Sequence, residues 1–272
     1  MSTADVSTKS ETPAPAYLIF DTETVPDGKL LAMVKYAGQG LSPVEAVQNA
    51  QAEAMALSRT GSDFLPVSFQ YPVAVCVMRV GPDFGIQALT CLDAPQFRPR
   101  EMVIQFWRGV AHYSRAKLVS YNGRGFDFPL MELAAFRYGC DLREYCRSGR
   151  HRFTGHLDLC DWLSNYGAYR IAGGLNLLSK LLGKPGKMEV TGDQVYMMHC
   201  AGKLQEINDY CMFDTLDTYF VFLRTRVLAG ELTLEREREL VVEAKEWIIE
   251  KAKGLPVLEQ YLTNWGDWEP WP

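Results

Sequence analysis

Long apolar runs are missing from this sequence, and none approaches the roughly 20 residues that a membrane-spanning helix requires. Residues 1–16 are mostly Ser, Thr, Pro and Ala with scattered charges and lack the apolar stretch of a signal peptide, so we expect a disordered leader. The seven cysteines have irregular spacings and form no Cys-x-x-Cys pair, which argues against a disulfide framework. We therefore expect free thiols, a cytoplasmic protein and no membrane contact.

A basic excess is also missing, because 28 Lys and Arg stand against 33 Asp and Glu, for a formal net charge of −5. This balance excludes a protein that coats nucleic acid by charge alone, but it allows an enzyme that meets phosphates through bound cations. The four histidines show no ligand spacing, which argues against a histidine metal site. At 272 residues and 47% hydrophobic content, the chain can bury a sizeable core.

The order of the predicted elements indicates a mixed-sheet α/β fold. Apolar and β-branched runs predict strands at 17–20, 71–80, 84–92, 118–121 and 157–162, the second and third as an antiparallel hairpin. Helical patterns cover 30–58, with a start signal at 42–45, then 100–112, 126–138, 175–182 and 204–228, the last long and amphipathic. The strands first meander and then alternate with helices, and a helical tail after residue 233 is expected to pack on the domain.

Acidic residues stand at three separated places where chemistry could be built. Asp21 and Glu23 follow an apolar strand at i and i+2, so their side chains share one face of an extended backbone. Asp127 lies where a strand hands over to a helix, and Asp214 lies one helical turn after Tyr210. Carboxylates at strand ends and on facing helices provide the oxygen ligands of a hard-cation site.

Each of these signals also has an ordinary structural interpretation. The 33 acids of the chain produce about four acid-x-acid pairs by chance, so the Asp21 and Glu23 pair alone is a weak signal. Asp127 could cap the helix that follows it, Asp214 could be a solvated helix residue, and Tyr210 could be a packed ring. The agreement of order, spacing and local context at all three places favours the metal site.

Three segments resemble the motifs of the DEDD 3′–5′ exonucleases. They are Phe20-Asp21-Thr22-Glu23-Thr24, then Ser120-Tyr121-Asn122-Gly123-Arg124-Gly125-Phe126-Asp127, then Tyr210-Cys211-Met212-Phe213-Asp214. The Tyr-x-x-x-Asp spacing is that of the DEDDy branch, and the middle segment is most similar to the proofreading domain of family B DNA polymerases and its stand-alone bacterial relatives. The resemblance covers about 17–224. It implies a ribonuclease H-like domain over 17–230, with a mixed five-stranded sheet flanked by helices, and a helical C-terminal extension over 231–272 packed on it.

The resemblance also implies an activity: hydrolysis of single-stranded 3′ ends, DNA favoured, to nucleoside 5′-monophosphates, with two Mg²⁺ or Mn²⁺ ions as cofactors. In such a site Asp21, Glu23 and Asp214 hold one cation, Asp21 bridges to the second, and Asp127 holds the second largely through water. Tyr210 orients the attacking water as general base or hydrogen-bond partner. The implied substrate contacts are Thr22, Thr24, Val25, Asn122 and Phe126, although core packing remains the simpler interpretation of Phe126.

Two alternatives stay open. One is an RNA-trimming exonuclease with the same site, because contacts to the 2′-hydroxyl distinguish the two nucleic acids and no residue here identifies them. The other is a catalytically idle nucleic-acid-binding or scaffold protein. A proofreading role rests on analogy alone, since a fold does not determine a biological role.

Weaker features complete the picture. Two basic tracts could contact phosphates: Arg143, Arg147, Arg150, His151 and Arg152 in one, and Lys180, Lys184 and Lys187 in the other. The interval 27–66 is long for a link between strands and could be a helical flap. Trp265, Trp268 and Trp271 are expected to belong to a docked tail, although an exposed patch there could bind a protein partner.

Overall fold

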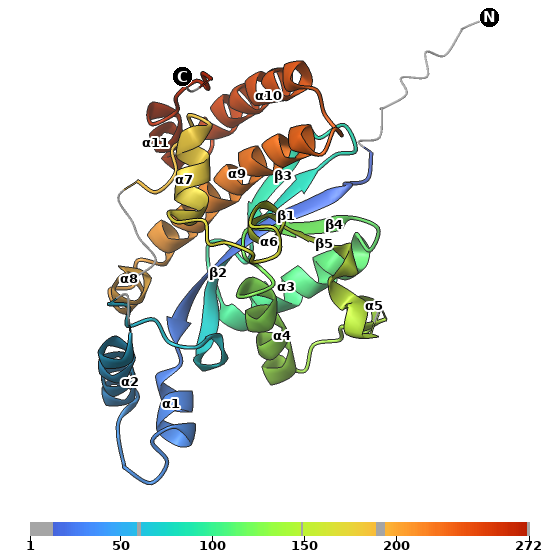
Figure 1. The fold of residues 1–272 in the computed structure, drawn as a ribbon. Coiled ribbons are helices and arrows are strands. Elements are labelled where there is room, and N and C mark those ends of the chain that lie inside the picture. The colour runs from blue at the N-terminus through green and yellow to red at the C-terminus, as the bar shows by residue number, and fades with distance from the viewer. Residues whose placement is uncertain (1–12, 59–60, 148, 189–193, 271–272) are drawn as a thin grey trace, which may run out of the picture.

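A mixed sheet lies between two layers of helices in the computed structural model, which describes residues 13–58, 61–147, 149–188 and 194–270 (Figure 1). The described strands are β1 (Tyr17–Pro26), β2 (Gln70–Val80), β3 (Ile86–Cys91), β4 (Lys117–Ser120) and β5 (His156–Asp158), and they form one five-stranded sheet in the order β3-β2-β1-β4-β5. β2 pairs antiparallel with β1 and β3, whereas β4 pairs parallel with β1 and β5. The α/β fold class and the hairpin predicted from sequence are therefore confirmed.

Side-chain alternation along β1 separates the two cores of the molecule. Leu18 and Phe20 point to the core shared with α3 (Pro99–His112) and α4 (Asp127–Tyr138), whereas Ile19 points to the core shared with α9 (Leu204–Leu228). All three side chains are at most 3% exposed, as expected for a central strand covered on both faces. Burying a side chain of this size contributes about 1.5–3 kcal/mol, so β1 is held firmly between the layers.

β1 extends well past the end of its neighbour β4. The parallel pairing covers only Tyr17 to Ile19 of β1, but the antiparallel pairing with β2 continues to Pro26. The strand expected to end at residue 20 thus includes Asp21 and Glu23 rather than preceding them. Beyond Ile19 the β4 side of β1 has no strand partner among the described residues, and this is where the chain that leaves β4 turns towards α4.

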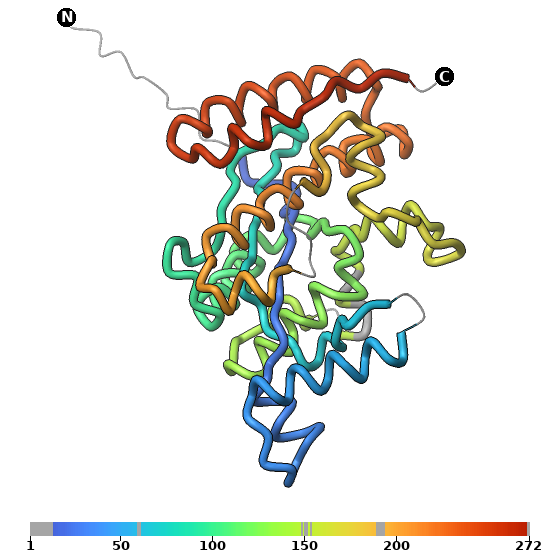
Figure 2. Tube along the Cα trace, turned by 90° about the vertical axis from the view of Figure 1, so that its left-hand side faces the viewer, coloured from blue at the N-terminus to red at the C-terminus, as the bar shows by residue number. Residues whose placement is uncertain are grey.

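The helix α9 is the centre of the other layer. It has the predicted bounds, but 17 of its 25 residues are buried, so the prediction of an amphipathic helix is wrong. Its outer side is covered by α7 (Gly174–Leu181), α8 (Val195–Cys200) and α10 (Leu234–Ala252), with α11 (Val257–Thr263) beside α10 (Figure 2). The local pattern of α9 could not reveal this, because the helices and strands that cover it lie outside residues 204–228.

An insertion separates β1 from β2 and contains α1 (Gly28–Val34), α2 (Pro43–Leu57) and the 3-10 helix η1 (Val67–Phe69). The helical pattern over 30–58 is therefore two helices. The second begins at the predicted signal, where Ser42 and Glu45 form a reciprocal capping box. The insertion has a small core of its own, made of Leu31, Tyr36, Ala46, Val47, Ala50 and Leu65.

The prediction of a strand over 157–162 is correct only for residues 157 and 158. β5 ends at Asp158 and α6 (Leu159–Leu163) follows, because the Asp158 carboxylate accepts the backbone N–H groups of Cys160 and Asp161 and so caps the helix. The helix α5 (Arg143–Cys146) and the 3-10 helix η2 (Gly149–Gly155) precede β5, and α7 follows α6.

Both ends of the described chain are attached to the domain. Of the expected leader, Ala16 donates to Val80 and accepts from Lys117, while residues 1–12 lie outside the described residues. At the C-terminal end, Trp265 packs edge-on against Phe220, with ring centroids 5.0 Å apart, whereas Trp271 lies outside the described residues. The seven cysteines are all free thiols. Within the described part of the chain, no helix has the length and apolarity to cross a membrane.

Candidate active site

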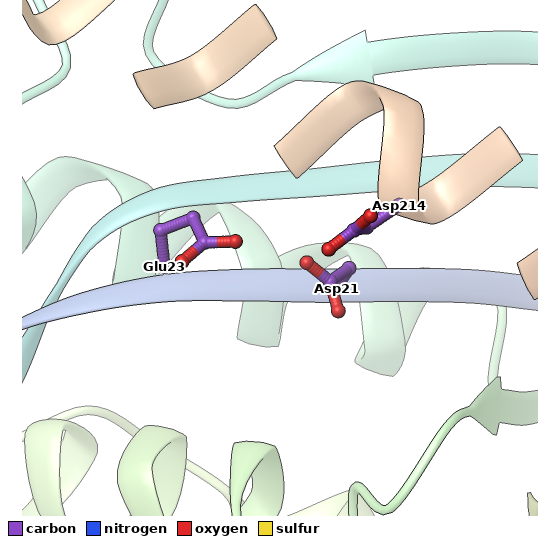
Figure 3. Close-up of side chains that lie close together, drawn as sticks. All are labelled: Asp21, Glu23 and Asp214. Carbon is purple, nitrogen blue, oxygen red and sulfur yellow. The ribbon is translucent and has the colours of Figure 1, made fainter. Parts of the chain in front are cut away.

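Three carboxylates converge between β1 and α9. Asp21 and Glu23 alternate onto the α9 face of β1, and Asp214 points at them from the helix (Figure 3). One oxygen from each residue lies within 4.8 Å of the other two. The i, i+2 spacing of a strand and the position of a buried helix are together sufficient to build this cluster.

Asp127 approaches from the other side of β1. Its carboxylate, at the first turn of α4, accepts a hydrogen bond of 2.6 Å from the Thr22 hydroxyl, and Thr22 alternates with Asp21 and Glu23 along the strand. Asp127 is buried and stands outside the group of three, yet its charge helps to raise the pKa of both Asp21 and Glu23. The four acids named from sequence therefore surround one short stretch of β1.

Burial and mutual repulsion leave these acids poorly compensated. Burial, with the neighbouring negative charges, raises the pKa of Asp21 and Glu23 well above the ordinary range. Burial likewise raises the pKa of Asp214 to about 6 and that of Asp127 to about 7. An all-oxygen donor set whose charges repel one another suits a hard divalent cation such as Mg²⁺ or Mn²⁺, which would offset that repulsion.

Tyr210 lies one turn before Asp214, and its hydroxyl is close enough to that carboxylate to lower the pKa of Asp214. Burial raises the pKa of Tyr210, and the charges of Asp214, Glu23 and Asp21 raise it further, so the phenol keeps its proton. The side chain lines a pocket of about 150 Å³ together with Asp214 and Met188. Tyr210 thus lies beside the acids, and both roles expected for it remain predictions.

A fifth acid, Asp158, fixes the loop that delivers Asp127, and the sequence interpretation missed it. Its two carboxylate oxygens accept the backbone N–H groups of Asn122 and Arg124 at 2.9 and 2.8 Å. Asn122 lies in the left-handed region, with φ +63°. The next residue must be glycine, because a Cβ at position 123 would overlap the Ser120 hydroxyl. The signal that could have identified Asp158 is its position as an acid at the start of a helix, three residues before a second acid.

The residues expected to contact substrate differ in what they can offer. The Thr22 and Thr24 hydroxyls donate to Asp127 and Gln70, and the Val25 side chain is fully buried, so only their backbone is available. Asn122 is exposed. Phe126, the fifth of these residues, is half-buried and packs against Phe64. These contacts remain predictions.

The lysine tract consists of one buried side chain, Lys184, and two exposed ones, Lys180 and Lys187. Lys184 is 3% exposed, lies 4.3 Å from the Trp265 ring centroid and donates to the carbonyl of Gly266, and its burial lowers its pKa to about 8. Its role is therefore to hold the C-terminal tail. Lys187, in contrast, is exposed, and its charge lowers the pKa of Glu23 and Asp214, which places it beside the acids.

The arginine tract makes ion pairs within its own part of the chain. Arg143, Arg147 and Arg152 pair with Asp141, Glu144 and Glu132, respectively. The side chains of Arg150 and His151 lie outside the described part of the chain. These ion pairs reduce the charge that the tract could offer to phosphates.

A mixed sheet of this order, with acids from a central strand and two helices meeting at one place, is the arrangement of ribonuclease H-like exonucleases. The chain belongs to the family described as predicted 3′–5′ exonucleases related to the exonuclease domain of PolB, whose model matches residues 62–265, about three quarters of the sequence. The match includes Asp127, Tyr210 and Asp214. Asp21 and Glu23 precede the matched residues, but the structure places them beside Asp214. No curated protein matches the chain.

Proposed function

We propose that this protein is a metal-dependent 3′–5′ exonuclease that removes nucleoside 5′-monophosphates from single-stranded nucleic-acid ends. The observation that carries the proposal is the convergence of Asp21, Glu23 and Asp214 to within 4.8 Å, with Asp127 beside them. Acids this crowded destabilise the protein unless a cation shares their charge, so their grouping supports a metal-binding role.

Two divalent cations, Mg²⁺ or Mn²⁺, would supply Lewis acidity here, lowering the pKa of an attacking water and stabilising the leaving oxygen. In this assignment Asp21, Glu23 and Asp214 hold one cation, and Asp21 with Asp127 holds the other. The Thr22 hydroxyl keeps the Asp127 carboxylate oriented through its 2.6 Å hydrogen bond.

The other side chains position the reacting groups. The protonated Tyr210 hydroxyl, which lies near Asp214, orients the attacking water by a hydrogen bond. Lys187 provides a positive charge at the edge of the acid cluster, where the substrate phosphate would otherwise meet only negative groups.

DNA is the favoured substrate, because the family is related to the exonuclease domain of a polymerase. Digestion of matched DNA and RNA oligonucleotides under the same conditions tests this preference. Faster digestion of RNA would reassign the protein to RNA trimming with the same residues in the same roles.

The activity is tested with a 5′-labelled single-stranded oligonucleotide and Mn²⁺, comparing the wild type with Asp21→Asn and Asp214→Asn. Because both substitutions keep shape and remove a cation ligand, we expect hydrolysis to fall by about 10³-fold or more while oligonucleotide binding falls much less. Asp83→Asn is the matched control, since Asp83 is exposed and lies outside the carboxylate group. An active Asp214→Asn variant, or a product ladder that starts at the 5′ end, would refute the assignment.

Calorimetry distinguishes the proposed exonuclease from the alternative of a catalytically idle binding or scaffold protein. A binding or scaffold protein without a working site predicts no heat of Mn²⁺ binding that depends on Asp21, whereas the exonuclease predicts binding that Asp21→Asn abolishes.

A further inference from the structure

Two phenylalanine rings from distant parts of the chain lie in contact at the residue that precedes Asp127. Phe64, in the insertion between β1 and β2, is 50% exposed, and Phe126 is half-buried immediately before Asp127. Their ring centroids are 5.6 Å apart and their planes are inclined by 51°. The pair therefore presents aromatic surface to solvent at the start of α4.

The core beneath this pair is complete without it. Phe128, two residues further along α4, is fully buried and packs edge-on against Phe20, with centroids 5.2 Å apart. The first turn of α4 thus directs one ring into the core and leaves the other at the surface beside Asp127. Core packing, which was the simpler interpretation of Phe126 from sequence, accounts for Phe128 only.

Phe64 is held in place by the strand that carries the acids. Its neighbour Leu65 is buried in the insertion's core, and the Leu65 carbonyl accepts a 2.7 Å hydrogen bond from the Gln70 side chain. The Gln70 side chain in turn accepts from the Thr24 hydroxyl, and Thr24 follows Glu23. Two hydrogen bonds therefore connect the backbone next to Phe64 to the acid-bearing part of β1.

A second set of contacts attaches the insertion to α4. Asp27, at its first turn, forms an ion pair with Arg137 of α4, and its backbone N–H donates to the Phe69 carbonyl at 2.7 Å. The 3-10 helix η1 packs against α4 as well. Because both rings are attached to supports that are joined to each other, their relative position is set before any ligand arrives.

We propose that Phe64 and Phe126 together stack on a base of the single-stranded substrate close to the scissile phosphate, which makes the insertion a substrate-binding element. The inference rests on the exonuclease activity proposed above, and the occupant follows from the position of Phe126 immediately before Asp127, one of the acids that would hold the cations at that phosphate. Every base has a π-face, so such a site accepts single strands without sequence preference and disfavours bases held in a duplex.

The test compares Phe64→Leu with the wild type in steady-state hydrolysis of a single-stranded DNA oligonucleotide. Leucine keeps an apolar side chain but removes the aromatic face, so we expect KM to rise about five- to tenfold, with kcat changed by less than about twofold. Phe64→Tyr should restore the wild-type KM. Leu57→Ala is the matched control, because Leu57 belongs to the same insertion and is 85% exposed, and it should leave both constants unchanged.

A scan of abasic substrates identifies the contacted nucleotide. Removing the base that the pair contacts should raise the wild-type KM as much as Phe64→Leu does, and it should raise the KM of the variant no further. If Phe64→Leu and Leu57→Ala both behave as wild type on every substrate, the stacking site is refuted and the rings are free for another partner, such as a protein.

The p-nitrophenyl ester of thymidine 5′-monophosphate separates this inference from the proposed function. If the wild type hydrolyses the ester and the oligonucleotide, but Phe64→Leu has the wild-type KM for the oligonucleotide, the inference alone fails. If the wild type hydrolyses neither substrate in the presence of Mn²⁺, the proposed function fails and the inference fails with it.

Discussion

Replacing Asp127 with asparagine should stabilise the metal-free protein at neutral and alkaline pH. The amide oxygen can still accept the Thr22 hydrogen bond, so the substitution removes the charge and keeps the shape. Burial raises the pKa of Asp127 from 3.8 to about 7. The folded protein therefore binds this proton more tightly than the unfolded chain does, and its stability falls as the pH rises from about 4 to about 7.

The size of the effect follows from that interval. The pKa of Asp127 differs by about 3 units between the folded and unfolded states, and each unit corresponds to about 1.36 kcal/mol. Above pH 7 the unfolding free energy of the wild type should therefore be about 4 kcal/mol lower than that of Asp127→Asn. For a chain of 272 residues, whose unfolding entropy is about 0.6 kcal/mol/K, this equals an increase in Tm of about 7 °C. Near pH 4 the wild type and Asp127→Asn should melt together.

Thermal unfolding in chelator-containing buffers from pH 2 to pH 8 measures the difference. Asp93→Asn is a control of opposite sign, because the Arg98 side chain hydrogen-bonds to Asp93 and lowers its pKa to about 2. That variant should be less stable than the wild type at pH 8, and its deficit should shrink as the pH falls below 4 towards 2. A pH-independent difference for Asp127→Asn, or a loss of stability at pH 8, would contradict the reasoning.

Three further outcomes are expected. Mn²⁺ at about 100 times its Kd should raise the Tm of the wild type by about 5 °C, and the shift should vanish in Asp21→Asn; a shift that survives places the cation elsewhere. Tyr210→Phe should lower kcat by about 10²-fold or more with little change in KM, since it removes only the hydrogen bond to the attacking water; an unchanged kcat would exclude that role. Asp158→Ala should lower the free energy of unfolding in urea by about 3 kcal/mol, because the backbone N–H groups of Asn122 and Arg124 lose their acceptor. An unchanged unfolding midpoint would show that the loop keeps its conformation without Asp158.

Features that depend on neighbouring residues were the most predictable from sequence. The bounds of α9 and the capping box of Ser42 and Glu45 agree with the structure, because a helix pattern and a cap are set within a few residues. Strand alternation places Asp21 and Glu23 on one face, and helical spacing does the same for Tyr210 and Asp214. That the acids of the two faces meet was implied by the resemblance to the DEDD exonucleases, and the structure brings them together.

Features that depend on distant segments were not predictable in this way. β1 runs to Pro26 because β2 supplies a partner beyond the end of β4, and no property of residues 21–26 announces that partner. Lys184 is identical in type to the exposed Lys187, yet the packing of Trp265 and Phe220 decides that it is buried. The role of Asp158 depends on a loop more than thirty residues earlier in the chain.

The hydrogen bond between Tyr261 and Asp217 connects the end of the chain to its chemistry. The Tyr261 hydroxyl of α11 donates to the Asp217 carboxylate at 2.6 Å, and Asp217 lies less than one turn after Asp214 on α9. A protein shortened after α9 would keep all four acids of the proposed site but would leave this inner aspartate without its phenol. The proposed site is thus joined to the residues that follow α9, and we expect such a truncation to impair it without removing any of the proposed metal ligands.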